Sequence, residues 1–107
     1  MIFNRRKKVL FDKKEIEIVV AGLEEYRYEA VDDLKQLRVI DGLLDLLTGC
    51  TRDEIHIKLK QYNLGVVINA LTRLWYKMQE RNQNTDELDM LINSHFITNL
   101  FSFFRAK

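Results

Sequence analysis

The sequence predicts an all-α protein: two similar helical hairpins, at about 12–48 and 62–104, joined by a short helix at about 52–60 into a small four- to five-helix bundle. The chain has no proline and only four glycines in 107 residues, so most residues that interrupt helices are missing. Apolar residues recur at three- and four-residue steps, which places them on one helix face. A single gap-free offset of 48 residues aligns residues 16–46 with residues 64–94, which indicates a possible internal repeat.

The first hairpin begins at Asp12. In the stretch DKKE, Asp12 can cap a free backbone N–H while the glutamate three residues later reaches back, and this capping box predicts a helix over residues 12–31. An acidic break follows, so a second helix is expected to start at Asp32 or Asp33. That helix meets Gly49, a residue suited to the left-handed conformation that ends many helices.

The second hairpin follows the short connecting helix. The stretch TRDE resembles a second capping box, which predicts the helix at 52–60 with Ile55 and Leu59 on its inner side. A longer amphipathic helix comes next, and the polar stretch ERNQNTDE behind it contains Thr85, a good N-cap. The last helix carries another apolar stripe and is expected to continue to about Phe104.

The possible repeat covers both helices of each hairpin and the turn between them. Five residues meet identical residues at this offset: Val19, Leu23, Tyr28, Asp41 and Leu43. Helical periodicity alone could produce part of this match, so duplication and common patterning both remain open. If the halves are duplicates, each hairpin is a unit that cannot bury its own apolar face, and the two pack face to face around one core.

Length and composition bound the class of protein. The chain fits a single domain, residues 1–107, and its net charge of +1 gives no global attraction to a phosphate backbone. Cys50 is the only cysteine, which excludes an intrachain disulfide and a four-cysteine zinc site and fits a reducing cytoplasm. No apolar run approaches the roughly 20 residues that span a bilayer, so no transmembrane segment is expected.

Two family resemblances accompany this pattern. The stretches FDKKEIEIVVAGLEEYRYEA and YNLGVVINALTRLWYKMQE resemble short helical proteins of low-GC Gram-positive bacteria and their phages, which combine an acidic capped helix, a polar turn and a leucine-rich helix. The stretch DDLKQLRVIDGLLDLLTGCTRDEI is similar to phage tail-assembly chaperones, although the basic start and the aromatic C-terminus differ from theirs. The resemblances imply a bacterial or phage origin and bring no catalytic residues.

Candidate catalytic residues are few. Asp53 and His56 would share a face of the short helix, but two ligands do not make a metal site. Two acid pairs also share helix faces, as in magnesium-dependent nucleotide hydrolases: Glu25 with Glu29, and Asp86 with Asp89. His95 lies in an apolar stripe and is expected to pack in the core. We therefore assign no catalytic, cofactor-binding or metal-binding residue, expect no cofactor, and expect that the protein is not an enzyme.

The two termini are more suggestive. A basic N-terminal arm, residues 1–10, contains Arg5, Arg6, Lys7 and Lys8, which could contact nucleic acid, an acidic partner or an anionic membrane, or simply stay solvated. At the other end, the phenylalanines of FITNLFSFFRAK exceed what one helix stripe can bury. A partner-binding surface, or one for a second copy in a homo-oligomer, is therefore expected at Ile97, Phe101 and Phe104, with Trp75 as a further anchor.

The leading hypothesis is a non-enzymatic helical module for protein–protein interaction or regulation, bacterial or phage and cytoplasmic. The alternative is a nucleic-acid-associated regulator that uses the basic arm, with helices at 52–60 and 63–81 imitating a helix-turn-helix and further contacts on the outer face of the second of them: Arg73, Lys77 and Arg81. More remote alternatives are a phage tail-assembly chaperone and a metal-dependent nucleotide hydrolase.

Overall fold

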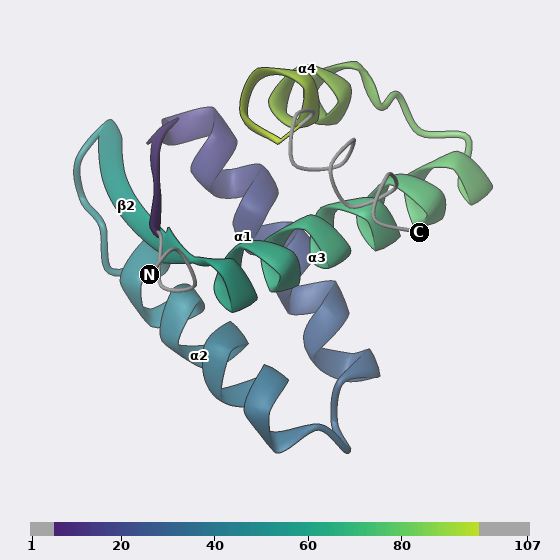
Figure 1. The fold of residues 1–107 in the computed structure, drawn as a ribbon. Coiled ribbons are helices and arrows are strands. Elements are labelled where there is room, and N and C mark those ends of the chain that lie inside the picture. The colour runs from purple at the N-terminus through teal and green to yellow at the C-terminus, as the bar shows by residue number, and fades with distance from the viewer. Residues whose placement is uncertain (1–5, 97–107) are drawn as a thin grey trace.

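A computed structural model describes residues 6–96 of the chain and, from residue 8 onward, their side chains (Figure 1). The elements are, in order, β1 (Arg6–Asp12), α1 (Lys13–Glu29), α2 (Leu34–Thr48), β2 (Glu54–Lys60), α3 (Gln61–Glu80) and α4 (Asp86–His95). The described part is therefore mostly helical, as predicted. It also contains a two-stranded sheet that the prediction lacked.

The expected short helix at 52–60 is wrong, because Glu54–Lys60 is the strand β2. Its apolar residues alternate with polar ones, so that Ile57 and Leu59 are buried and Ile55 is partly buried. A strand places all three on one face, whereas a helix would turn Ile57 away from the other two. The strand's hydrogen-bonding partner is β1, which begins in the predicted N-terminal arm, continues to Asp12 and pairs with β2 in antiparallel register.

Each half of the described chain is a strand followed by two helices. The offset of 48 residues that aligns the helices also carries β1 onto β2, end to end. Val9 pairs with Ile57 at the centre of the ribbon, and a β-carbon at Gly22 would lie 3.4 Å from the carbonyl oxygen of Ala70 where α1 meets α3. Both contacts join residues 48 apart, as an approximate twofold axis through them would require. Gene duplication as the origin of this arrangement stays a prediction.

Buried residues of both halves form one core. Its members include four pairs at equivalent positions: Val19 with Val67, Leu23 with Leu71, Ile40 with Leu88, and Leu43 with Leu91. In Figure 1 α1 and α3 cross at the centre of the molecule, while α2 and α4 lie on opposite sides of them. The ribbon closes one edge of this core with the buried side chains Val9, Phe11, Ile57 and Leu59.

The helix starts of the first half follow the sequence signals. Asp12 accepts a hydrogen bond from the backbone of Glu15 (2.8 Å), and Glu15 accepts one from the backbone of Asp12 (3.0 Å), which confirms the predicted capping box. Asp33 caps α2 by accepting a hydrogen bond from the backbone N–H of Gln36 at 3.1 Å. Both local predictions therefore hold, because the cap and its donor are only three residues apart.

Two expected helix ends differ from the structure. Gly49 ends α2, but its φ of −78° is right-handed rather than left-handed. Its lack of a side chain matters for space, since a β-carbon there would lie 3.0 Å from the carbonyl oxygen of Asp45. Helix α4 ends at His95 and not at Phe104, and residues 97–104 of the expected helix lie outside the described residues.

The helices of residues 6–96 are too short or too polar to cross a membrane.

Candidate functional site

The ribbon has one face toward the core and one toward solvent. Its outer face comprises Lys8, Leu10 and Asp12 on β1, and Glu54, His56, Lys58 and Lys60 on β2, all of them exposed. The alternation of side chains along each strand produces this division, because the residues between them point into the core. Leu10, at 38% exposed, is the one large apolar side chain on the outer face.

The antiparallel register gathers positive charge at one end of the outer face. Lys8 stands opposite Lys58, and Lys60 pairs through its backbone with Arg6. We call Lys8, Lys58 and Lys60 the basic end. The opposite end pairs Asp12 with Glu54, and we call these two residues the acidic end. The ribbon is thus electrically polar along its length although the whole chain carries a formal charge of only +1.

The basic end is not neutralised from within the described molecule. Like charges directly opposite each other destabilise an antiparallel pair, by a few tenths to about 1 kcal/mol. Among the side chains that the structure describes, none forms an ion pair with Lys8, Lys58 or Lys60. As far as the described residues show, these ammonium groups can meet an external anion, which would relieve the repulsion between them.

Helix α3 begins at the basic end. Its N-cap is Lys60, and within the described residues no side chain accepts a hydrogen bond from the free N–H groups of its first turn. The positive end of the helix dipole therefore adds to the charge of the lysines. Lys35 lies beside this turn, with its ammonium nitrogen 4.2 Å from the centre of the Tyr62 ring. Helix α1, at the acidic end, has the capping box instead.

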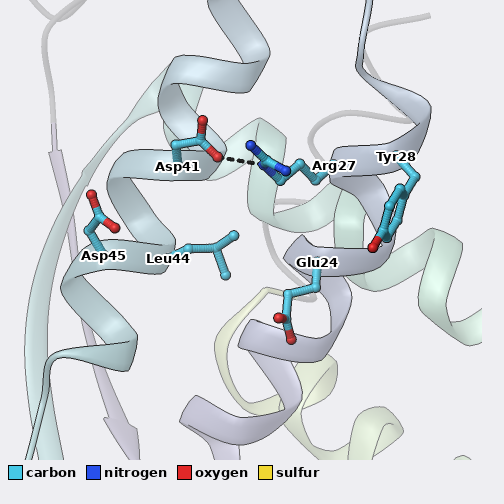
Figure 2. Close-up of a pocket in the computed structure, with 6 residues that line it drawn as sticks. All are labelled: Glu24, Arg27, Tyr28, Asp41, Leu44 and Asp45. Carbon is cyan, nitrogen blue, oxygen red and sulfur yellow. Dashed lines mark hydrogen bonds and ion pairs between the residues drawn. The ribbon is translucent and has the colours of Figure 1, made fainter.

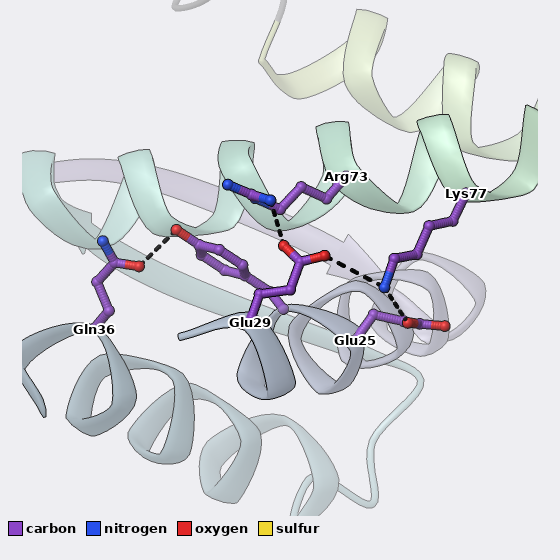
Figure 3. A network of polar contacts seen from close by, with 6 residues as sticks. Glu25, Glu29, Gln36, Arg73 and Lys77 are labelled. Carbon is purple, nitrogen blue, oxygen red and sulfur yellow. Dashed lines mark hydrogen bonds and ion pairs between the residues drawn. The ribbon is translucent and has the colours of Figure 1, made fainter. Parts of the chain in front are cut away.

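The cations expected on the outer face of α3 are paired with carboxylates of α1, and Figure 3 shows the contacts of Arg73 and Lys77. Lys77 lies 2.8 Å from Glu25 and 3.4 Å from Glu29, Arg73 pairs with Glu29, and Arg81 lies 3.5 Å from Glu25. The hydrogen bond from Lys77 holds the pKa of Glu25 below its ordinary value of 4.5. These contacts join α1 to α3 and pair each of the three cations with a carboxylate, while the side chains of Arg73 and Arg81 stay at least half exposed.

Two of the three candidate ligand pairs from the sequence have other surroundings in the structure. Glu25 and Glu29 are occupied by the cations of α3. His56 lies on a strand, so it does not share a helix face with Asp53, as the predicted short helix implied. No group of three or more potential metal ligands occurs in the described part of the chain.

His95 and Cys50 have structural surroundings. The Nε2 atom of His95 lies 2.8 Å from Glu15, and its ring packs edge-on against Phe11 with the ring centres 5.4 Å apart. This histidine joins the end of α4 to the start of α1. Cys50 is half-buried, and its Sγ lies 3.8 Å from the carbonyl oxygen of Arg52.

An open groove of about 470 Å³ separates α1 from α2 (Figure 2). It is lined by Glu24, Arg27, Tyr28, Asp41, Leu44 and Asp45. Arg27 donates a hydrogen bond from Nε to Asp41 across it at 2.7 Å, and both side chains are about half exposed. Its acidic lining opposes nucleic acid, so this groove and the basic end differ in the ligands that they favour.

Most of the expected partner surface lies outside the described residues, namely Ile97, Phe101 and Phe104, and it stays a prediction. Trp75 is half-buried and donates its indole N–H to Asp89 at 2.8 Å. This bond ties α3 to α4 just as that between Arg27 and Asp41 ties α1 to α2, and the two bonds join equivalent positions of the two halves.

In the structure, part of the expected basic arm forms β1, which pairs with a second basic segment in β2. Arg5 lies outside the described residues, and Arg6 and Lys7 belong to β1, but their side chains are not described. Lys8 is exposed beside lysines of β2 that the sequence interpretation assigned to a helix. The alternating stretch EIHIKLK was the signal that could have found them.

Comparisons with protein-family models, with curated proteins and with solved structures find no match. The function is therefore inferred from the geometry and charge of the outer ribbon face.

Proposed function

We propose that this protein is a non-enzymatic DNA-binding module that lays the outer face of its ribbon in the major groove of duplex DNA. The observation that carries the proposal is the apposition of Lys8 and Lys58, without acidic partners among the described side chains, on a solvent-facing antiparallel ribbon. Nucleic-acid association is the second hypothesis from the sequence, and the outer face of the ribbon supplies a surface on which it could occur.

The dimensions of the ribbon suit the major groove. Neighbouring strands lie about 4.8 Å apart, and the major groove of B-form DNA is about 12 Å wide and admits a two-stranded ribbon with its side chains. Several DNA-binding proteins read the groove with strands in this way. The base-facing surface would consist of the central outer residues Lys8, Leu10, His56 and Lys58.

The charge of the basic end suits a phosphate backbone. Lysines that neutralise phosphates release condensed counterions, and this release supplies much of the affinity of DNA-binding proteins. The repulsion between Lys8 and Lys58 falls when an anion approaches. The free energy that this repulsion costs in folding therefore contributes to binding. Because the net charge of the chain is only +1, this local patch has to supply the attraction, and binding should depend steeply on salt.

Fluorescence anisotropy of a labelled DNA duplex, titrated with the whole protein at several salt concentrations, tests the proposal. The variant Lys8→Gln/Lys58→Gln is compared with Arg27→Gln/Arg81→Gln. This control also loses two positive charges, but near the C-terminal ends of α1 and α3. We expect the ribbon variant to bind roughly tenfold more weakly or worse at low salt, and its plot of log affinity against log salt to be less steep by about 2.

The control variant should bind like the wild type. Equal losses in both variants would show that only net charge matters and would contradict a ribbon site. No binding of the wild type to duplex DNA at low salt would overturn the proposal.

A further inference from the structure

We infer, on the basis of the proposed function, that the ribbon reads a non-palindromic DNA site in one orientation, with guanines under its lysine pair and a thymine under Leu10. Four central residues of the outer face carry this inference: Lys8, Leu10, His56 and Lys58. They surround the approximate twofold axis that passes through the pairing of Val9 with Ile57.

The two strands have kept their inner chemistry and diverged on the outer face. At the offset of 48 residues, Val9 corresponds to Ile57 and Phe11 to Leu59, and all four are buried and apolar. The outer positions do not match: Lys8 corresponds to His56, Leu10 to Lys58, and Asp12 to Lys60. The approximate symmetry that the core preserves is therefore broken on the face that would touch DNA.

The antiparallel register turns this divergence into two different half-surfaces. On one side of the axis Lys8 stands beside Lys58, and on the other Leu10 stands beside His56. Had the outer residues of the two strands been the same, each side would have presented the same pair. The ribbon instead offers two ammonium groups on one side, and an aliphatic group with an imidazole on the other.

These half-surfaces suit different base edges. Guanine presents two acceptors, O6 and N7, to the major groove and is the usual partner of lysine, whereas thymine presents a methyl group that apolar side chains contact. A palindrome shows the same edges on both sides of its centre, so it cannot satisfy both halves. Because residues along a strand and base pairs along the helix axis each rise about 3.4 Å, the site should span about four to six base pairs.

The opposite charges at the two ends of the ribbon determine the orientation of the protein on the DNA. The basic end attracts the phosphates that flank the groove, and the acidic end repels them. Reversing the protein on its site would bring Asp12 and Glu54 to the phosphates that Lys60 faces in the favoured orientation. Lys60 and the guanine-reading pair of Lys8 and Lys58 therefore lie over the same half of the site.

Selection from a pool of randomised DNA duplexes tests the inference. It is run with the whole protein and with the variant Leu10→Lys/His56→Lys, which places lysine at all four central outer positions. We expect the wild type to enrich a non-palindromic motif, guanine-rich in one half and with a thymine in the other, and to lose roughly tenfold or more in affinity when one of its base pairs is changed. The variant should enrich a motif that is guanine-rich in both halves.

A palindromic motif for the wild type would overturn the inference, as would the same motif for both proteins. Duplex binding without any enriched motif would overturn it and leave the proposed function standing. No duplex binding at low salt would overturn both.

Discussion

Lys8 and Lys58 are cross-strand partners on the exposed face of the ribbon. Elsewhere in the described molecule several cations at helix contacts have carboxylate partners, as Lys77 has Glu25 and Arg27 has Asp41. The two ribbon lysines instead face each other at a cost in folding free energy. Binding of an anionic ligand, as proposed, would relieve this unfavourable pairing.

Reversing one charge of this pair should raise the stability of the protein and lower its affinity for DNA. In Lys8→Glu the repulsion is replaced by an opposite-charge cross-strand pair, so the free energy of unfolding should rise by about 0.5–1 kcal/mol. Affinity for duplex DNA should fall, because a lysine is lost and a carboxylate gained in the groove. Urea unfolding and anisotropy on the same samples measure the two effects, with Lys8→Gln as an intermediate. Parallel changes in stability and affinity would contradict this account of the pair.

The capping box at the acidic end should be worth a measurable part of the stability. Asp12→Ala removes the acceptor for the backbone N–H of Glu15, and we expect the free energy of unfolding to fall by about 1 kcal/mol. Asp12→Asn keeps an acceptor oxygen and should lose less. Chemical denaturation of both variants measures the difference, and an equal loss in both would mean that the charge of Asp12, rather than its cap, is what stabilises α1.

The contact between Lys77 and Glu25 predicts a dependence of stability on pH. The pKa of Glu25 is lowered from 4.5 in the folded protein by the hydrogen bond from Lys77. A carboxyl group with a lowered folded pKa stabilises the protein above its unfolded pKa, and this contribution is lost as the pH falls through the folded value. The free energy of unfolding should therefore exceed that of Lys77→Met at neutral pH, and the gap should shrink on acidification below pH 4.5. Urea unfolding across this range tests it, and a gap that does not change with pH would contradict it.

Two glycines should respond in opposite ways to added bulk. Gly22 lies where α1 meets α3, and a β-carbon there would already be 3.4 Å from the carbonyl oxygen of Ala70, so Gly22→Val should lower the free energy of unfolding by about 1–3 kcal/mol. A β-carbon at Gly65, on α3, would meet no neighbouring side chain or element within 4 Å, and Gly65→Ala should raise the free energy of unfolding by about 0.5–1 kcal/mol. Thermal unfolding compares them. Tolerance of Gly22→Val would show that the helices do not approach as closely as described.

The helical elements could be predicted because their signals are local. The capping box at Asp12, the cap at Asp33 and the apolar stripes each lie within a few turns of the chain, and the structure bears them out. The strand β2 is harder to predict, because two of its apolar residues are ambiguous. Ile55 and Leu59 fit a helix face as well as a strand face, and the residue that decides between them is Ile57, which only a strand places beside both. The strand's partner lies 48 residues away at the centre of the ribbon, a distance at which no local pattern reports a pairing.

Only part of the candidate site can be predicted from the sequence, because its two strands are far apart along the chain. The basic run that includes Lys8 was identified, but its cross-strand neighbour Lys58 was assigned to the expected short helix. Charge along the chain reveals a basic segment; only the antiparallel register shows that two such segments meet at one end of a surface. Likewise, the helical periodicity predicts Lys77 on an outer face, whereas in the structure its ammonium group lies 2.8 Å from Glu25 of α1.

The most direct test of the ribbon as the DNA-binding surface is to record backbone amide NMR spectra of the isotope-labelled whole protein while a short DNA duplex is added. We expect the shifts to concentrate on β1, β2 and the first turn of α3, with Lys8 and Lys58 among the residues affected, while α2 beyond its first turn and α4 stay unchanged. Shifts that centre on α2 or α4 and leave both strands unaffected would contradict it.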